Sequence, residues 1–133
     1  MTEARADWTD GERFVAVGSS NHSVVFDSDR QSNRAPGPME MVLLALCACT
    51  ATDVVTILRK KREPFTRVSV RAEAERAAES PMVFTSIRLI YTVGGKVTKK
   101  AVEDAVRLSE EKYCSVSAMV KKTARITTEI EQE

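Results

Sequence analysis

Three cysteines are the residues of this 133-residue chain with the widest range of chemistry. They are Cys47, Cys49 and Cys114. A thiolate can attack an electrophile, hold a metal ion or form a disulfide. An odd count argues against a framework of structural disulfides. The Cys47-x-Cys49 spacing differs from the C-x-x-C of thioredoxin-like proteins, and the single histidine, His22, supplies a Cys/His zinc site poorly. We therefore expect thiols, with no metal and no cofactor.

Two of the cysteines fall within a strongly apolar segment that we predict to be helical over residues 38–58. Pro38 suits the first turn of a helix, and the cations at 59–62 suit its C-terminal end. Residues two apart on a helix point about 200° away from each other. Cys47 and Cys49 therefore cannot pair, and at most one of them faces a given pocket. For a buried cysteine, the commoner role is that of a small core residue.

Cys114 has a different setting, at a break between a predicted helix over 99–112 and a short helix over 117–123. A thiol just ahead of a helix feels the positive end of the helix dipole, which favours the thiolate. The alternative is a cysteine that only caps or fills a turn.

The remaining elements must position these cysteines. Thr98 is a plausible N-cap for the helix over 99–112, whose predicted inner stripe ends at Ser109. Period-two alternation predicts strands on either side of the helices. Strands and helices are grouped rather than alternating, which indicates an α+β fold in one domain over 1–133. The full set of predicted strands is 13–17, 23–26, 67–75, 83–91 and 124–130.

Composition limits the partners. Hydrophobic residues make up 43% and charged residues 29% of the chain, and the formal net charge is +1. This balance gives no reason to expect nucleic acid or an anionic membrane as a partner.

The first 11 residues lack the apolar stretch of a secretory signal, and the apolar run over 41–49 is too short to span a bilayer. We expect a cytoplasmic protein. The long helix is apolar almost all round, and a second copy of the chain could cover it, so we expect a homodimer.

Two segments of the chain resemble the OsmC/Ohr family. Residues 37–55 read GPMEMVLLALCACTATDVV, similar to the central helix of an OsmC-like branch, G-P-M-E-L-L-L-L-A-L-G-G-C-T-x-x-D-V-V. Residues 111–117 read EKYCSVS, similar to the family's second cysteine segment, often K-x-C-P-V-S. The resemblance implies an OsmC-like fold, in which a long buried helix is wrapped by antiparallel sheets in an intertwined homodimer.

The resemblance also implies roles for individual residues. Cys49 would be the peroxidatic and Cys114 the resolving cysteine of a thiol peroxidase that consumes organic hydroperoxides or hydrogen peroxide, with an external dithiol as reductant. Cys47 falls where the branch usually has glycine, so it is assigned to packing. Arg13 would hold Cys49 as thiolate, and Glu40, one place later than the Ohr glutamate, would orient Arg13. The same scaffold is compatible with a stress-response or ligand-binding protein of little turnover, or with a purely structural dimer.

Overall fold

A computed structural model describes residues 1–133, and the chain divides into two compact units, an N-terminal unit over 1–44 and a C-terminal unit over 45–133. The expectation of one domain over 1–133 stays a prediction. The N-terminal unit contains strands β1 (Ala4–Asp10), β2 (Arg13–Gly18) and β3 (Ser23–Asp27) and the start of helix α1 (Pro38–Lys60). The C-terminal unit contains the rest of α1 and β4 (Phe65–Arg76), β5 (Phe84–Gly95), α2 (Lys99–Leu108), the π-helical turn η1 (Ser109–Tyr113), α3 (Ser115–Val120) and β6 (Arg125–Gln132).

The N-terminal unit is an antiparallel meander in the order β1-β2-β3. The backbone N–H of Asn21 donates to the Gly18 carbonyl at 2.9 Å, which closes the turn between β2 and β3. Strand β1 was not predicted, although Ala4, Ala6 and Trp8 alternate with Arg5, Asp7 and Thr9, because alanine favours strands only weakly and every side chain of the strand is exposed. Cross-strand hydrogen bonds to β2 define it instead.

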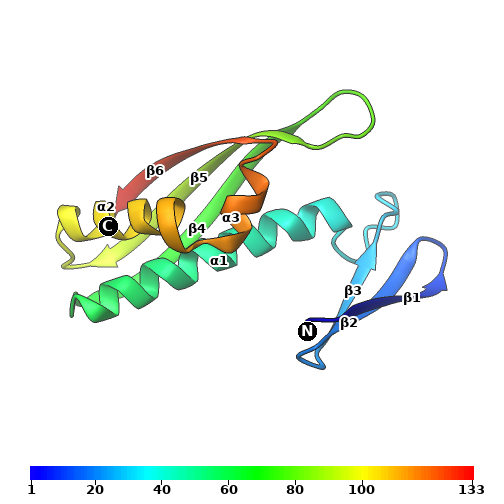
Figure 1. The fold of residues 1–133 in the computed structure, drawn as a ribbon, viewed down its shortest axis with the longest axis horizontal. Helices are drawn as coiled ribbons and strands as arrows, with labels where there is room; N and C mark the ends of the chain where they lie inside the picture. The colour runs from blue at the N-terminus through cyan, green and yellow to red at the C-terminus, as the bar shows by residue number, and fades with distance from the viewer. The chain divides into compact units, whose positions relative to one another are not determined.

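The C-terminal unit is a three-stranded sheet with β5 in the centre. Helices α1 and α2 lie along one side of this sheet (Figure 1). Strand β4 pairs with β5 in antiparallel fashion, but β6 pairs with β5 in parallel, so the sheet is mixed rather than antiparallel as expected. The chain returns through α2 and α3 before β6, which is the kind of crossover that a parallel pair requires. The core comprises β5 side chains such as Ile87, Leu89 and Tyr91 and the helix residues packed on them.

Helix α1 buries one stripe within the chain. The stripe recurs every four residues, at Leu46, Thr50, Val54 and Leu58, and all four are fully buried. The expectation of burial on most sides is therefore not met by a single chain. By length and composition α1 could also cross a membrane, contrary to the estimate from its short apolar run. Its buried stripe is nonetheless part of the core of the C-terminal unit, as in the central helix of a globular domain.

The two later helices follow their predicted signals. The Thr98 hydroxyl caps α2 by accepting from the Ala101 N–H at 3.2 Å. The predicted inner stripe of α2 is buried, including Ser109. The helix leaves the α-helical pattern at Ser109, earlier than predicted, and passes into η1. Helix α3 then begins at Ser115.

Gly95 ends β5 in a conformation that other residues rarely adopt. Its φ is +104°, and an added Cβ would lie 2.6 Å from the Pro64 carbonyl oxygen. Gly95→Ala should lower the free energy of unfolding by at least about 2 kcal/mol, since strained backbone alone costs about 1–3 kcal/mol. Urea denaturation measures the change. Gly18→Ala is the control, because its nearest neighbouring atom lies at 3.6 Å and its φ is ordinary. Equal stabilities for the two variants would contradict the expectation.

Candidate active site

Cys49 and Cys114 are neighbours in the C-terminal unit. Cys49 is half-buried on α1, and Cys114 is 3% exposed at the start of α3. Cys114 is the N-cap of α3, and its Sγ accepts the backbone N–H of Ser117 at 3.3 Å. The chain thus folds so that two thiols more than 60 positions apart in the sequence come together.

The electrostatics of Cys114 differ from the sequence prediction. Burial raises the pKa of Cys114 to about 12, opposed by the Ser117 N–H and reinforced by the nearby Cys49 thiol and Asp53 carboxylate. The start of α3 does act in the predicted direction through the Ser117 N–H. Desolvation of a charged sulfur and the adjacent acidic groups outweigh it. Cys114 is therefore a thiol at neutral pH, because burial outweighs the predicted effect of the helix start, which by itself favours the thiolate.

A chain of buried hydroxyls lies beside the cysteines. The Thr50 Oγ1 lies 2.7 Å from the Tyr91 Oη and 2.8 Å from the Ser109 Oγ. The Ser109 hydroxyl donates to the Asp53 carboxylate at 2.8 Å. Thr50 directly follows Cys49 in the sequence, and Asp53 lies four residues after it. The hydroxyl chain therefore connects the Cys49 segment of α1 to β5 and η1.

A second acidic group, Glu110, closes the other end of this network. One carboxylate oxygen of Glu110 accepts the Tyr91 hydroxyl at 3.2 Å, and the other accepts the Ser117 hydroxyl at 3.1 Å. Burial is the main cause that raises the pKa of Tyr91, so its hydroxyl remains protonated. Glu110 thus links the central strand to the helix that Cys114 caps.

Sequence reasoning missed the roles of Thr50, Asp53, Ser109 and Glu110. Ser109 was placed on the inner stripe of a helix, where a polar residue among apolar ones was a usable signal of a buried hydrogen bond. Thr50 and Asp53 lie within the predicted helix over 38–58, but no role was predicted for them. No pattern in the sequence identified Glu110.

Arg13 and Glu40 both lie in the N-terminal unit, but they do not form an ion pair with each other. The Arg13 guanidinium contacts the Asp10 carboxylate at 2.7 Å and holds the pKa of Asp10 below its usual range. Glu40 instead lies 3.7 Å from Arg30. Arg30 also donates to the carbonyls of Asp27 and Ala35, so it organises the loop ahead of α1. The roles of Arg13 and Glu40 toward Cys49 stay predictions.

Two further residues considered from the sequence are Cys47 and His22. Cys47 is half-buried on α1, and burial raises the pKa of its thiol. His22 is exposed in the turn before β3, with its Nδ1 3.3 Å from the Ser20 hydroxyl. No group of three or more His, Cys, Asp or Glu side chains is arranged to hold a metal ion.

Two hollows mark the surface of the C-terminal unit. One, of about 330 Å³, begins at Asp53 and runs along α1 past Ile57 and Lys60, and Leu108 and Tyr113 also line it. Its lining combines apolar side chains with the carboxylate of Asp53 and the cations of two lysines.

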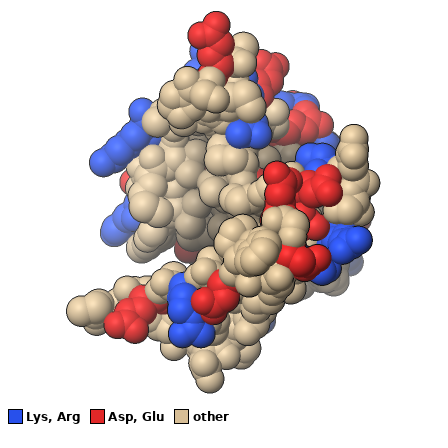
Figure 2. Space-filling view, turned by 90° about the vertical axis from the view of Figure 1, so that its right-hand side faces the viewer, with Lys and Arg blue, Asp and Glu red and all other residues tan.

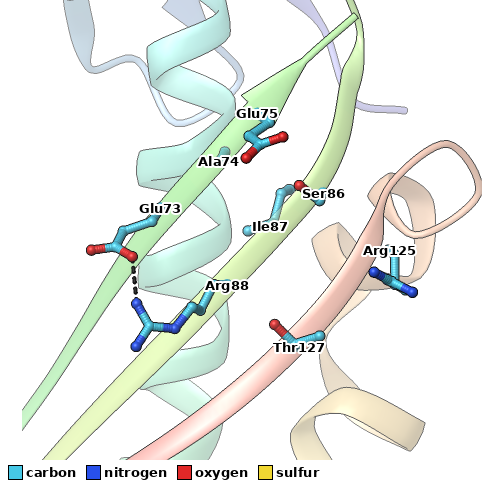
Figure 3. A pocket seen from close by; sticks show the side chains of 8 residues that line it. All are labelled: Glu73, Ala74, Glu75, Ser86, Ile87, Arg88, Arg125 and Thr127. Carbon is cyan, nitrogen blue, oxygen red and sulfur yellow. Dashed lines mark hydrogen bonds and ion pairs between the residues drawn. The ribbon is translucent and has the colours of Figure 1, made fainter.

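The second hollow, of about 420 Å³, lies on the sheet, away from the cysteines, between β4, β5 and β6 (Figure 3). Arg88 pairs there with Glu73 and also with Glu129. Cations and anions are likewise interspersed over the face of the molecule in Figure 2. Glu75 and Arg125 also line this hollow and form no ion pair, so its charges are only partly paired.

The fold and the neighbouring thiols define a small α+β protein with a cysteine pair between a long helix and a π-helical turn. A family model of the OsmC-like proteins matches residues 30–129. The chain is 43% identical to the protein YhfA of Escherichia coli K12 over 126 residues, which is 94% of this chain and 93% of that protein. The chain belongs to the OsmC-like family.

Solved structures agree with this assignment. A protein of Aquifex aeolicus VF5 is 31% identical, with a TM-score of 0.86 over 100% of this chain and 98% of that one. An organic hydroperoxide resistance protein of Legionella pneumophila has a TM-score of 0.73 at 16% identity, over 98% and 96% of the two chains. The predicted OsmC-like fold and family are confirmed.

The raised pKa of Cys114 predicts slow alkylation. In the Cys47→Ser/Cys49→Ser variant only Cys114 remains, and burial, the largest cause of its raised pKa, is kept. Iodoacetamide should therefore modify Cys114 in the native state at least about tenfold more slowly at pH 8 than after unfolding. Each pH unit below the pKa lowers the thiolate fraction tenfold, so the rate should still be rising above pH 10. Mass spectrometry of quenched samples follows the reaction. A rate that levels off near pH 8 would contradict the raised pKa.

Proposed function

We propose that this protein is a cytoplasmic thiol peroxidase that reduces organic hydroperoxides or hydrogen peroxide in defence against oxidative stress. Cys49 is the peroxidatic and Cys114 the resolving cysteine. The observation that carries the proposal is the proximity of the two thiols within the C-terminal unit. Membership in the OsmC-like family supports it, and a structural neighbour is named for organic hydroperoxide resistance.

The first step takes place at Cys49. Its thiolate attacks the terminal oxygen of the hydroperoxide, and the O–O bond breaks. The sulfur is oxidised to sulfenic acid, and the departing alkoxide takes up a proton and leaves as an alcohol, or as water when the substrate is hydrogen peroxide.

The second step uses Cys114. Its sulfur attacks the Cys49 sulfenic sulfur, the S–O bond breaks, and the hydroxyl leaves as water with the Cys114 proton. The product is the Cys49–Cys114 disulfide. An external dithiol then reduces the disulfide by thiol exchange. Because Cys114 is a thiol at neutral pH, loss of its proton is part of the barrier to this step.

The hollow along α1 supports an organic substrate. Its apolar lining at Ile57 and Leu108 suits an alkyl group, while hydrogen peroxide would need no such surface. We propose that this hollow accommodates the organic part of the hydroperoxide.

One observation favours the second candidate, a stress-response or ligand-binding protein with little turnover. Arg13 pairs with Asp10 rather than with Glu40, so the expected activating pair is not assembled within the N-terminal unit. A cysteine without a cation to stabilise its thiolate reacts slowly with peroxide.

We also propose that the protein is a homodimer. Among residues 1–44 only Asp27 is buried, and apolar side chains of the N-terminal unit remain exposed. A three-stranded sheet without a covered apolar face is not stable by itself in water. A second copy of the chain offers matching apolar surface on α1, where Leu44 is 49% exposed.

Substitution of the cysteines tests the peroxidase. Cys49→Ser should reduce peroxide consumption with dithiothreitol to the uncatalysed rate, because the nucleophile is lost. Cys114→Ser should accumulate a sulfenic acid that dimedone traps. Cys47→Ser is the matched control and should keep the parent rate. Stopped-flow measurement with cumene hydroperoxide and hydrogen peroxide follows the reaction. Unchanged consumption by Cys49→Ser would rule out the assignment.

Variants of two arginines identify the cation that stabilises the Cys49 thiolate. If Arg13 stabilises the Cys49 thiolate, Arg13→Met should slow sulfenic acid formation at least tenfold. Arg30→Met is the comparison, since Arg30 is the partner of Glu40. A loss confined to Arg30→Met would transfer the role to that residue.

The oligomeric state is tested by measuring the molar mass in solution. Light scattering at micromolar concentration should give about twice the 14.7 kDa of one chain. Leu44→Glu should shift the mass toward the monomer, because it would bury a charge in the proposed interface. A monomeric parent protein would contradict the dimer.

A further inference from the structure

Ser109 contacts both segments that carry the cysteines of the proposed peroxidase. Its side chain is fully buried at the junction of α2 and η1. The hydroxyl donates to Asp53 at 2.8 Å and lies 2.8 Å from the Thr50 hydroxyl. Both partners belong to the turn of α1 that begins at Cys49. The side chain of Ser109 is therefore fixed to the Cys49 segment.

The backbone of Ser109 is fixed to the other cysteine. Its carbonyl accepts the N–H of Cys114 at 2.8 Å. This hydrogen bond spans five residues and closes the π-helical turn η1. Single π-helical turns within helices occur frequently at functional sites. Beyond the turn, the Cys114 Sγ accepts from the Ser117 N–H, which fixes the sulfur as well as the amide.

We propose that Ser109 is a positioning residue that holds the Cys114 thiol against Cys49 for disulfide formation. One residue fixes the Cys114 backbone through its carbonyl and α1 through its hydroxyl. Asp53 serves as the anchor of that hydroxyl. Two groups held in reacting geometry have an effective concentration far above that of free groups, and a small displacement lowers it steeply. The inference rests on the proposed function and describes the geometry of its resolving step. The Cys49–Cys114 disulfide itself can form without peroxide.

Glutathione equilibrium tests the inference without peroxide. Protein carrying Cys47→Ser is equilibrated with reduced and oxidised glutathione at several ratios, quenched with acid and mapped for the Cys49–Cys114 disulfide. The midpoint gives the effective concentration of one thiol at the other. Ser109→Ala should lower this concentration at least tenfold. Ser115→Ala is the matched control, because Ser115 is exposed, adjoins Cys114 and makes no side-chain hydrogen bond, so it should match the parent.

A second pair of variants keeps the test decisive if Ser109→Ala fails to fold. Asp53→Asn retains an oxygen that can accept from Ser109, whereas Asp53→Ala does not. The effective concentration should therefore be at least threefold higher in Asp53→Asn than in Asp53→Ala. Parent-like values in Ser109→Ala, or equal values in the two Asp53 variants, would overturn the inference. A parent that forms the disulfide with glutathione but consumes no peroxide would instead overturn only the proposed function.

Discussion

The hydrogen bonds of the Ser109 hydroxyl to α1 are the interaction on which the arrangement of the C-terminal unit depends. An apolar side chain at this position could slide along an apolar helix with little change in energy. A hydroxyl cannot, because hydrogen bonds tolerate only a narrow range of distance and angle. Thr50 extends the same constraint to Tyr91 on the central strand. Since no buried side-chain nitrogen or oxygen lacks a partner, helix, strand and π-helical turn are held in one relative position.

The sequence was most informative where local chemistry decides the structure. Pro38, the terminal cations and the apolar run predicted α1 well, and Thr98 marked the start of α2. Strand β1 was missed although its residues alternate, because alanine gives one face only weak strand preference and pairing with β2 completes the strand. The parallel placement of β6 depends on the path of α2 and α3, which no local pattern encodes. The π-helical turn has no sequence signature, so the bond between Ser109 and Cys114 could not be predicted.

In the candidate site too, local patterns predicted some features, while tertiary packing decided the others. The cysteines were identified from their motifs, and the inner stripe already included Ser109. The acidity of Cys114 was misjudged because the short helix α3 was visible in the sequence while the burial of the sulfur was not. In the N-terminal unit, Arg13 pairs with Asp10 across the β1–β2 hairpin, and Glu40 pairs with Arg30 of the loop ahead of α1. Charged side chains on loops and strand edges have several partners within reach, and the sequence does not select among them.

The π-helical turn also makes the cysteine pair sensitive to the type of helix that precedes Cys114. A π-helical turn is equivalent to an α-helix that has gained one residue. If the same residues between Ser109 and Cys114 continued as an ordinary α-helix, the cysteine would lie about 100° further round the axis, and the two sulfurs would point apart. A chain with one residue fewer between these positions could keep the pairing with an uninterrupted α-helix, because an ordinary helical hydrogen bond would then replace the wider one. The residue count and the type of helix therefore determine the redox pairing together.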